Sequence, residues 1–397
     1  MKTKICILLA GIVLAGCGSQ AAAENGGTTA AKPGDCAKLA AIKPADNAAT
    51  TTLVVDNTAS GVQGPVPPAV GKALADAQNR GDRLEIVPVD GAGTPGRISR
   101  TVALDPYPGK KARTAVNARA IALACVGEWM RETAARPAAP GSDILAAITT
   151  ASREKPVAIL VVSDGLASAG EFDLNKAGFD DDPKTIADDL AAGGALAPTL
   201  SGSTVLWSGL GGSAAGLAPS LTSAVQGLWD AVLKKAGAKP EFDSRAGGTT
   251  SPTTGAPADP LPIPGTARQV TACGEQIVVP AALLFSPGSA DLHPDAGAII
   301  KQAAADLAAH PGWVAVIEGH TADYDTAAGR LALSQNRAQA VVTALTGLRI
   351  EANRLQPKGY GATRPAVPEF RDGRHDRAAA AKNRRVVLNL GPKGCVH

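Results

Sequence analysis

A stretch rich in proline, glycine and threonine interrupts the chain between residues 243 and 267. Its composition, as in TTSPTTGAPADP, supplies too few large apolar side chains to form a core. We therefore interpret it as an interdomain linker. It predicts two folded domains, an N-domain over residues 36–242 and a C-domain over residues 268–397, and a chain of 397 residues is long enough for both.

The N-terminal residues, MKTKICILLAGIVLAGC, have the order of a bacterial lipoprotein signal. Two lysines precede an apolar run too short to span a bilayer, and small residues then lead to Cys17. This resembles a lipobox, which implies a signal peptide over residues 1–16 and diacylation of Cys17; the alternative is an ordinary secretory signal with an incidental cysteine. Two acyl chains give stable membrane anchoring. Residues 17–35 are small and polar and are expected to form a tether.

Four cysteines remain in the chain expected after export: Cys36, Cys125, Cys273 and Cys395. An even number in an oxidising compartment predicts disulfides. Three pairings are possible, and Cys36–Cys125 with Cys273–Cys395 is favoured because each bridge then stays within one domain. The four show no spacing typical of zinc ligands.

Composition argues against two classes of function. A net charge of +3 and an aromatic content of 3% give little support for a nucleic-acid partner. All five histidines lie in the C-domain and no G-x-S-x-G motif occurs, so the N-domain lacks the usual general base of a hydrolase. We expect a protein that is not an enzyme. The alternatives are an envelope metal-dependent hydrolase and a structural tether whose sites are vestigial.

Apolar segments of strand length alternate with segments of helical periodicity in the N-domain. Strands are expected at 51–56, 83–89, 157–165 and 203–211, and helices at 66–81, 112–135, 142–154, 182–192 and 220–237. Ser142 and Asp182 are the expected N-caps of two of these helices. The alternation predicts a doubly wound α/β domain, in which ligands bind at the carboxyl ends of the strands.

Oxygen-bearing side chains follow the expected strands at that edge. Asp56, Thr58 and Ser60 lie in DNTAS, Ser142 follows a glycine, and Asp164 lies in SDG. Hard divalent cations prefer such oxygen ligands. The plain alternative is an Asx turn at Asp56, a helix cap at Ser142 and an Asp-Gly turn at Asp164.

The order of these residues resembles the metal-ion-dependent adhesion site of the von Willebrand factor A (vWA) family. The resemblance implies a vWA-like fold, a protein partner and a bound Mg²⁺. The hydroxyls of Thr58, Ser60 and Ser142 would be ligands, and Asp56 and Asp164 would orient them or bind through water. The family usually has serine at the position of Thr58 and threonine at that of Ser142, and both exchanges keep the hydroxyl.

The C-domain carries five motifs in a fixed order: FSPGSADL, EGHTA, LSQNRA, GYGATRP and NRRV. Strands are expected from 282, at 313–321, 354–361 and 383–390, with helices at 299–312 and 331–347. The motifs resemble the OmpA-like C-terminal domain, which implies a smaller α/β sandwich of βαβαββ type, closed by an antiparallel strand. That fold would bring Cys273 and Cys395 together. The family anchors proteins to peptidoglycan.

In that family an acid directly after G-H-T binds the ammonium group of diaminopimelate, and the arginine of LSxxRA binds its carboxylate. Arg337 matches the arginine, but Ala322 stands where the acid is expected. Arg330 stands where the family has an asparagine at the helix start. At this position the chain therefore lacks the acid that binds the ammonium group in the family.

Two interpretations of the site remain open. In one, Asp323 replaces the missing acid, and Thr321, Asp323 and Arg337 bind peptidoglycan, with Arg337 taking a ligand carboxylate in a bidentate fork. In the other, Asp323 and Asp325 neutralise Arg330 and Arg337, which leaves no free site.

Two further charged clusters have plain interpretations. The acidic segment FDDDP (179–183) fits a solvated helix start better than a calcium site. The basic run from Arg371 to Arg385 fits a solvated helix face with one or two buried partners better than a contact for anionic wall polymer.

These inferences predict a cell-envelope lipoprotein that faces the periplasm or the cell exterior. Its lipid would hold it to a membrane, its C-domain would bind peptidoglycan, and its vWA-like module would bind an unidentified envelope protein.

Overall fold

The structure, a computed structural model, describes residues 31–396 except 57, 59–64, 92–95, 134–138, 197–199, 213–216, 244–262 and 324. The expected signal peptide, the lipidation site Cys17 and most of the linker lie outside these residues. Within the described part of the chain, no helix combines the length and apolarity needed to cross a membrane.

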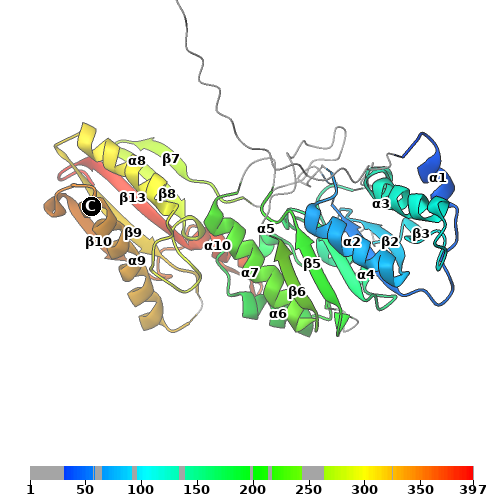
Figure 1. Cartoon of the computed structure of the whole chain (residues 1–397). Helices are drawn as coiled ribbons and strands as arrows, with labels where there is room; N and C mark the ends of the chain where they lie inside the picture. Colours follow the sequence, from blue (N-terminus) through cyan, green and yellow to red (C-terminus); the bar gives the residue numbers. More distant parts are fainter. Residues whose placement is uncertain are drawn as a thin grey trace, which may run out of the picture.

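The N-domain is built on a six-stranded sheet of order β3-β2-β1-β4-β5-β6 (Figure 1). All neighbouring strands are parallel except β3, which runs antiparallel to β2 at one edge. The strands are β1 (Thr50–Val55), β2 (Arg83–Pro88), β3 (Arg100–Ala103), β4 (Ala158–Val162), β5 (Thr204–Ser208) and β6 (Lys239–Asp243).

Helices cover both faces of this sheet. Alternate residues of β1 point to opposite sides, so that Val54 joins one apolar cluster and Leu53 joins the other. A sheet buried on both faces favours apolar strands such as β4. The predicted α/β fold class is confirmed. The helices are α1 (Asp35–Ala40), α2 (Pro68–Arg80), α3 (Arg113–Thr133), α4 (Ile144–Ala151), α5 (Leu174–Ala177), α6 (Pro183–Ala192) and α7 (Pro219–Lys235).

One of the two predicted helix caps is wrong. α4 begins two residues after Ser142, and Asp143 caps it by accepting a hydrogen bond of 3.0 Å from the Ala146 amide. An aspartate in the adjacent position is as good a cap as a serine. Asp182 does cap α6, as predicted, through a 2.8 Å bond from the Thr185 amide.

The C-domain contains a five-stranded sheet of order β10-β9-β13-β8-β7. β9 and β10 are parallel, and β13 lies antiparallel between β8 and β9, as predicted for the closing strand. The bounds are β7 (Ala267–Thr271), β8 (Gly274–Pro280), η2 (Ala281–Leu283), α8 (Ala296–Ala309), β9 (Trp313–His320), α9 (Ala327–Gly347), η3 (Ala352–Arg354), β10 (Leu355–Gly359), β11 (Phe370–Arg371), β12 (Arg374–His375), α10 (Arg377–Asn383) and β13 (Arg385–Pro392).

The strand expected from residue 282 lies earlier in the chain, at β8. β8 ends at Pro280, which has no amide hydrogen to continue a ladder, and the chain then turns into η2. α8 and α9 pack on one face of the sheet in a single apolar cluster.

Two disulfides close the domains. Cys36 and Cys125 join α1 to α3, and Cys273 and Cys395 join the β7–β8 turn to the end of the chain. Both match the favoured pairing.

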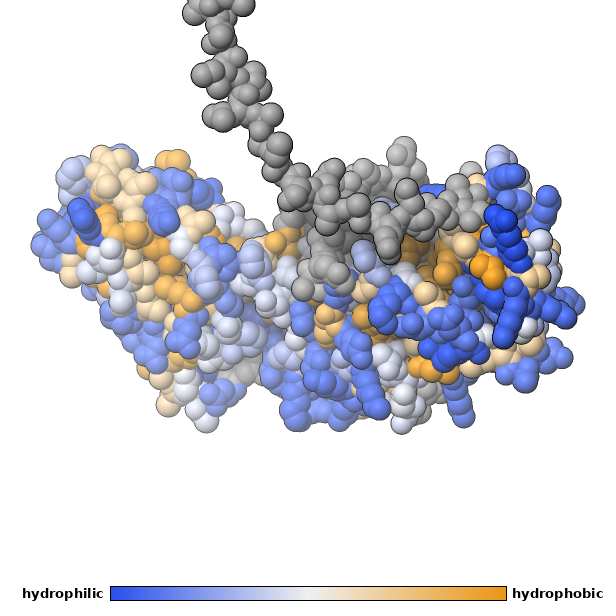
Figure 2. All heavy atoms as spheres, in the orientation of Figure 1, coloured by the Kyte–Doolittle hydropathy of each residue, from blue (hydrophilic) through white to orange (hydrophobic). Residues whose placement is uncertain are grey.

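In Figure 2, hydrophilic residues cover much of one face of the molecule, with smaller apolar areas between them.

Candidate functional sites

The first candidate site lies where two neighbouring strands of the N-domain end. β1 and β4 are parallel partners, and Asp56 follows β1 while Ser163 and Asp164 follow β4. The strand order reverses between them, because β2 lies beyond β1 and β5 beyond β4. Such a reversal opens a crevice at the carboxyl ends of the strands.

Asp56 is the centre of a buried hydrogen-bond network there. Its Oδ1 accepts bonds from the Thr58 amide at 3.2 Å and the Thr58 hydroxyl at 2.7 Å, and its Oδ2 accepts one from the Ser163 hydroxyl at 2.6 Å. The Thr58 hydroxyl also lies 2.5 Å from the Ser142 hydroxyl. Since Asp143 caps α4, the Ser142 side chain is available for this contact. No motif in the sequence indicated a role for Ser163.

The donor set suits a hard cation. Asp56, Thr58, Ser142 and Asp164 are all almost completely buried, and each offers oxygen. Adjacent ligands of an octahedral Mg²⁺ are roughly 3 Å apart when each bond is about 2.1 Å. The Thr58–Ser142 separation needs only a small adjustment to reach that value. Among described residues, no three His, Cys, Asp or Glu gather as metal ligands, so a cation here would depend on hydroxyls. Ser60 lies outside the described residues.

The second candidate site surrounds α9 in the C-domain. Arg330, Ser334 and Arg337 share one face of this helix, as their spacing predicts. The helix backbone lies directly over β9: a Cβ at Gly319 would come within 2.0 Å of the Ser334 carbonyl oxygen. The glycine of EGHTA therefore allows the helix to approach the strand.

Asp323 does not lie against Arg337. Its carboxylate pairs with Arg330 at 2.5 Å, and Arg330 also donates to the Asp325 carbonyl oxygen at 2.6 Å. The carboxylate of Asp323 and the backbone carbonyl of Asp325 therefore both contact Arg330. The expectation that they would also neutralise Arg337 is not met by any contact in the described part of the chain.

Arg337 is almost completely buried, with 2% of its surface exposed. Its Nε donates to the Ser289 carbonyl oxygen at 2.8 Å, and its guanidinium carbon lies 5.1 Å from the centre of the Phe285 ring. Burial lowers the pKa of Arg337 to about 10, while the Asp180 carboxylate opposes this shift and the Arg384 guanidinium adds to it. The acid whose charge raises the pKa of Arg337 is therefore Asp180, which belongs to the N-domain.

The loop before α9 is held by a buried acid that no motif indicated. Glu369 accepts hydrogen bonds from the Asp323 amide at 2.9 Å and from the Asn383 side chain at 3.0 Å, and lies 2.7 Å from His375 Nε2. Within this loop the Thr321 hydroxyl is buried and forms no hydrogen bond with the described residues. Ala322 is buried beside it.

The acidic segment and the basic run meet across the two domains. Arg384 donates from Nε to Asp180 at 2.7 Å, and its Nη2 lies 2.8 Å from Asp181. Both aspartates are buried, so the interpretation of FDDDP as a solvated helix start is wrong for these two residues. Arg384 is one of the buried partners that the basic run was expected to contain.

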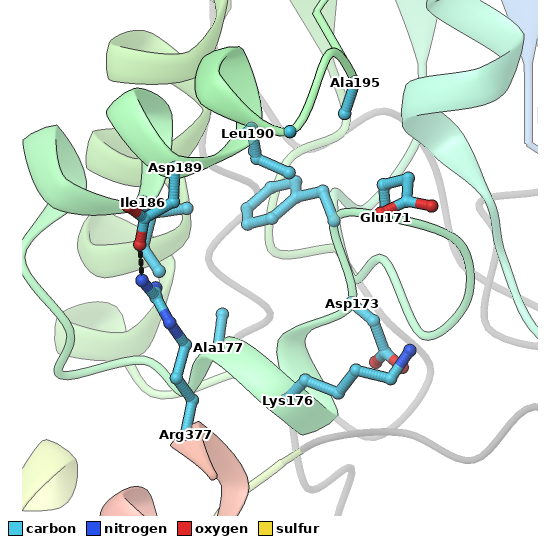
Figure 3. Close-up of a pocket in the computed structure, with 11 residues that line it drawn as sticks. Glu171, Asp173, Lys176, Ala177, Ile186, Asp189, Leu190, Ala195 and Arg377 are labelled. Atoms are coloured by element: carbon cyan, nitrogen blue, oxygen red, sulfur yellow. Dashed lines mark ion pairs between the residues drawn. The ribbon is translucent and has the colours of Figure 1, made fainter. Parts of the chain in front are cut away.

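Further contacts surround this ion-pair cluster. Arg377 of α10 pairs with Asp189 of α6, at one side of a cleft of about 270 Å³ that α5 and α6 also line (Figure 3). On the other side, Asp295 accepts a 2.7 Å hydrogen bond from the Ser220 hydroxyl of α7. In Figure 1, α10 lies beside the helices of the N-domain.

The C-domain is an α/β sandwich, because two helices pack on one face of its mixed five-stranded sheet. The second of these helices carries a buried arginine. Residues 284–379 match the OmpA family, so this part of the chain is an OmpA-like domain. The comparison with curated proteins gives no match.

Three solved structures resemble this domain. The periplasmic domain of Helicobacter pylori MotB is 23% identical and covers 33% of this chain and 83% of its own, with a TM-score of 0.29. The peptidoglycan-associated lipoprotein of Burkholderia pseudomallei is 30% identical and covers 28% and 93%, with a TM-score of 0.25. The cell wall anchor of the T6SS from Pseudomonas aeruginosa is 22% identical and covers 32% and 87%, with a TM-score of 0.28.

Proposed function

We propose that the chain is a non-enzymatic envelope protein whose C-domain binds peptidoglycan through Arg337. The observation that carries the proposal is the OmpA family match over residues 284–379, with Arg337 at the position of the family's ligand-binding arginine. Its guanidinium is oriented by the Ser289 carbonyl oxygen and the Phe285 ring. An oriented guanidinium matches the two oxygens of a carboxylate.

Diaminopimelate, with a carboxylate and an ammonium group at the free end of its side chain, is the proposed target within the wall. Arg337 would bind the carboxylate. The buried Thr321 hydroxyl, which has no partner among the described residues, supports a ligand contact at the same loop. Asp323 is half-exposed and pairs with Arg330, so a role in binding the ammonium group requires it to exchange partners.

Co-sedimentation of the full chain with purified diaminopimelate-type peptidoglycan tests this proposal. Arg337→Ala should raise the half-saturating amount of peptidoglycan about ten-fold or more, because each tenfold change corresponds to about 1.4 kcal/mol and a charged hydrogen bond contributes at least that much. Arg337→Lys, which keeps the charge but not the fork, should be intermediate. Arg371→Ala removes an exposed arginine of the same domain and should bind as the wild type does. Equal binding of Arg337→Ala and wild type would refute the proposal.

For the N-domain we propose a vWA-like module that binds an envelope protein. The sheet order and the buried oxygen set at the ends of β1 and β4 support this assignment. Thr58 and Ser142 would hold a Mg²⁺, with Asp56 and Asp164 orienting them; a bound cation would offer an open coordination position to an acidic group of the partner.

We also propose that the chain is a lipoprotein anchored through Cys17. The support is the order of charged, apolar and small residues before that cysteine. The lipid would hold one end of the chain at a membrane, and the C-domain would hold the other at the wall. Metabolic labelling with a fatty-acid probe, in wild type and Cys17→Ser, tests the anchor directly.

A further inference from the structure

Asp180 of the N-domain lies at the arginine that the proposed function assigns to the wall ligand. It accepts a hydrogen bond of 2.7 Å from Arg384 Nε and interacts electrostatically with Arg337. The Arg384 guanidinium also lowers the pKa of Arg337, as a nearby like charge does. A carboxylate beside two guanidinium groups relieves that repulsion.

This arrangement is buried from solvent. Arg337, Arg384 and Asp180 are 2%, 7% and 8% exposed. Asp180 belongs to the loop between α5 and α6, whereas both arginines belong to the C-domain. The N-domain therefore lies against Arg384 and brings a carboxylate within electrostatic range of Arg337, and we call the site of these two guanidinium groups the notch.

We propose that Asp180 is an internal mimic of the ligand's carboxylate, and that the N-domain keeps the peptidoglycan notch closed until this loop withdraws. The inference rests on the proposed function, because it requires the notch to bind peptidoglycan. It adds that wall binding is regulated by the contact between the two domains.

The rest of the contact is suited to reversible closure. Its polar part includes the pair of Arg377 with Asp189 and the hydrogen bond from Ser220 to Asp295, and its apolar part includes Ala282 and Leu283, which pack on the N-domain cluster. The packing next to Arg384 is close, since a Cβ at Gly178 would come within 3.0 Å of the Ala381 side chain and 3.2 Å of Arg384 Nη2. Interfaces between domains of one chain permit relative motion unless they are large and mainly apolar.

Closure lowers apparent affinity by the fraction of molecules that are open. If about one molecule in ten is open, releasing the N-domain should improve binding about ten-fold. A partner that binds the N-domain and separates it from the C-domain would then increase wall binding without touching the notch.

The test compares Asp180→Asn with Asp182→Asn in the full chain, by co-sedimentation with purified diaminopimelate-type peptidoglycan. Both variants remove one negative charge from FDDDP. Asp182 is exposed, and asparagine preserves its cap on α6. Asp180→Asn should lower the half-saturating amount of peptidoglycan about ten-fold, and Asp182→Asn should leave it unchanged. Adding Arg337→Ala to Asp180→Asn should abolish the gain.

The outcomes separate the two proposals. If Asp180→Asn binds as the wild type does while Arg337→Ala binds more weakly, the closed notch is refuted and peptidoglycan binding stands. If Arg337→Ala also binds as the wild type does, both proposals fail.

A second pair of variants guards against misfolding of Asp180→Asn. Asp189→Arg breaks the pair with Arg377 at the edge of the contact, where Asp189 is more than half exposed. It should also improve binding, and adding Arg377→Asp should restore the wild-type value. No change on Asp189→Arg would contradict the closed notch independently of Asp180.

Discussion

Arg384 donates a hydrogen bond of 2.7 Å to Asp180, a residue 204 positions earlier in the chain. The pair joins the last helix and strand of the C-domain to a loop of the N-domain. The charge of Arg384 lowers the pKa of Arg337, the residue expected to bind peptidoglycan, so the contact between the domains lies within electrostatic range of the proposed wall-binding notch. The N-domain thus contributes to both candidate sites, since its loop at Asp180 contacts Arg384 and its strand ends carry the oxygen set proposed for a cation.

Acid should stabilise the folded chain through Asp181. Burial raises the pKa of Asp181 to about 6, with Arg384 opposing the shift and Asp180 adding to it; Arg377 and His375 also lower it. The folded state therefore binds this proton more tightly than the unfolded state, whose aspartate has a pKa near 3.8. The stability contributed by the protonated group is complete below pH 4 and is lost as the pH rises to about 6. The total is about 3 kcal/mol.

Thermal unfolding of wild type, Asp181→Asn and Asp182→Asn between pH 4 and pH 7.5 checks the sign of this pH dependence of stability. The melting temperature of wild type minus that of Asp181→Asn should fall as the pH rises. Hydrogen bonds from Thr185 lower the pKa of Asp182 below 3.8, so this carboxyl stays ionised over most of this range and the difference for Asp182→Asn should be nearly flat. Parallel curves for the two variants would contradict the assigned burial of Asp181.

Magnesium should stabilise the N-domain. A cation that binds only the folded state adds about 2.7 kcal/mol at one hundred times its dissociation constant. The wild-type melting temperature should therefore rise with added MgCl₂ and return to its starting value with EDTA. Asp56→Ala should show no rise, because the Thr58 and Ser163 hydroxyls lose their acceptor.

Asp76→Ala is the matched control for this measurement. Asp76 is a half-exposed residue of α2 that pairs with Lys72, far in sequence from the strand ends. This variant should keep the full magnesium effect. Loss of the effect in both variants would show that the stabilisation comes from general surface binding.

Gly319→Ala should destabilise the C-domain strongly. The added Cβ would meet the Ser334 carbonyl oxygen at 2.0 Å, so α9 or β9 must move, and such overpacking costs about 1–3 kcal/mol or more. Gly297→Ala in α8 adds the same methyl group where nothing lies within 4 Å, and it should be neutral or stabilising by up to about 1 kcal/mol. Chemical denaturation of both variants measures the contrast. Equal stability would mean that α9 does not approach β9 as described.

The features that could be predicted from sequence are those with a local or periodic signature. The apolar run of β4 and the alternation of strands and helices gave the α/β class, and the ordered motifs from FSPGSADL to NRRV gave the C-domain sandwich. The two disulfides followed from keeping each bridge within one domain. The edge strands β3 and β6 were missed because they are short and partly polar.

The missed parts of the sites depend on tertiary contacts. Nothing near Asp180 in the sequence indicates Arg384 as its partner, and a carboxylate buried by another domain has the same local sequence as a solvated one. Ser142 was expected to cap a helix, and only the geometry shows Asp143 doing so while Ser142 meets Thr58. Glu369 lies outside every motif, although it holds the loop at Asp323.

The most direct measurement of the central claim compares two kinds of cell wall. Diaminopimelate carries a carboxylate that lysine lacks at the same position of the stem peptide, and Arg337 is proposed to bind that group. The full chain should co-sediment with diaminopimelate-type peptidoglycan at least about ten-fold more tightly than with lysine-type peptidoglycan. This preference should disappear in Arg337→Ala. If the wild type and the Asp180→Asn variant were each retained equally on both walls, the account would be contradicted.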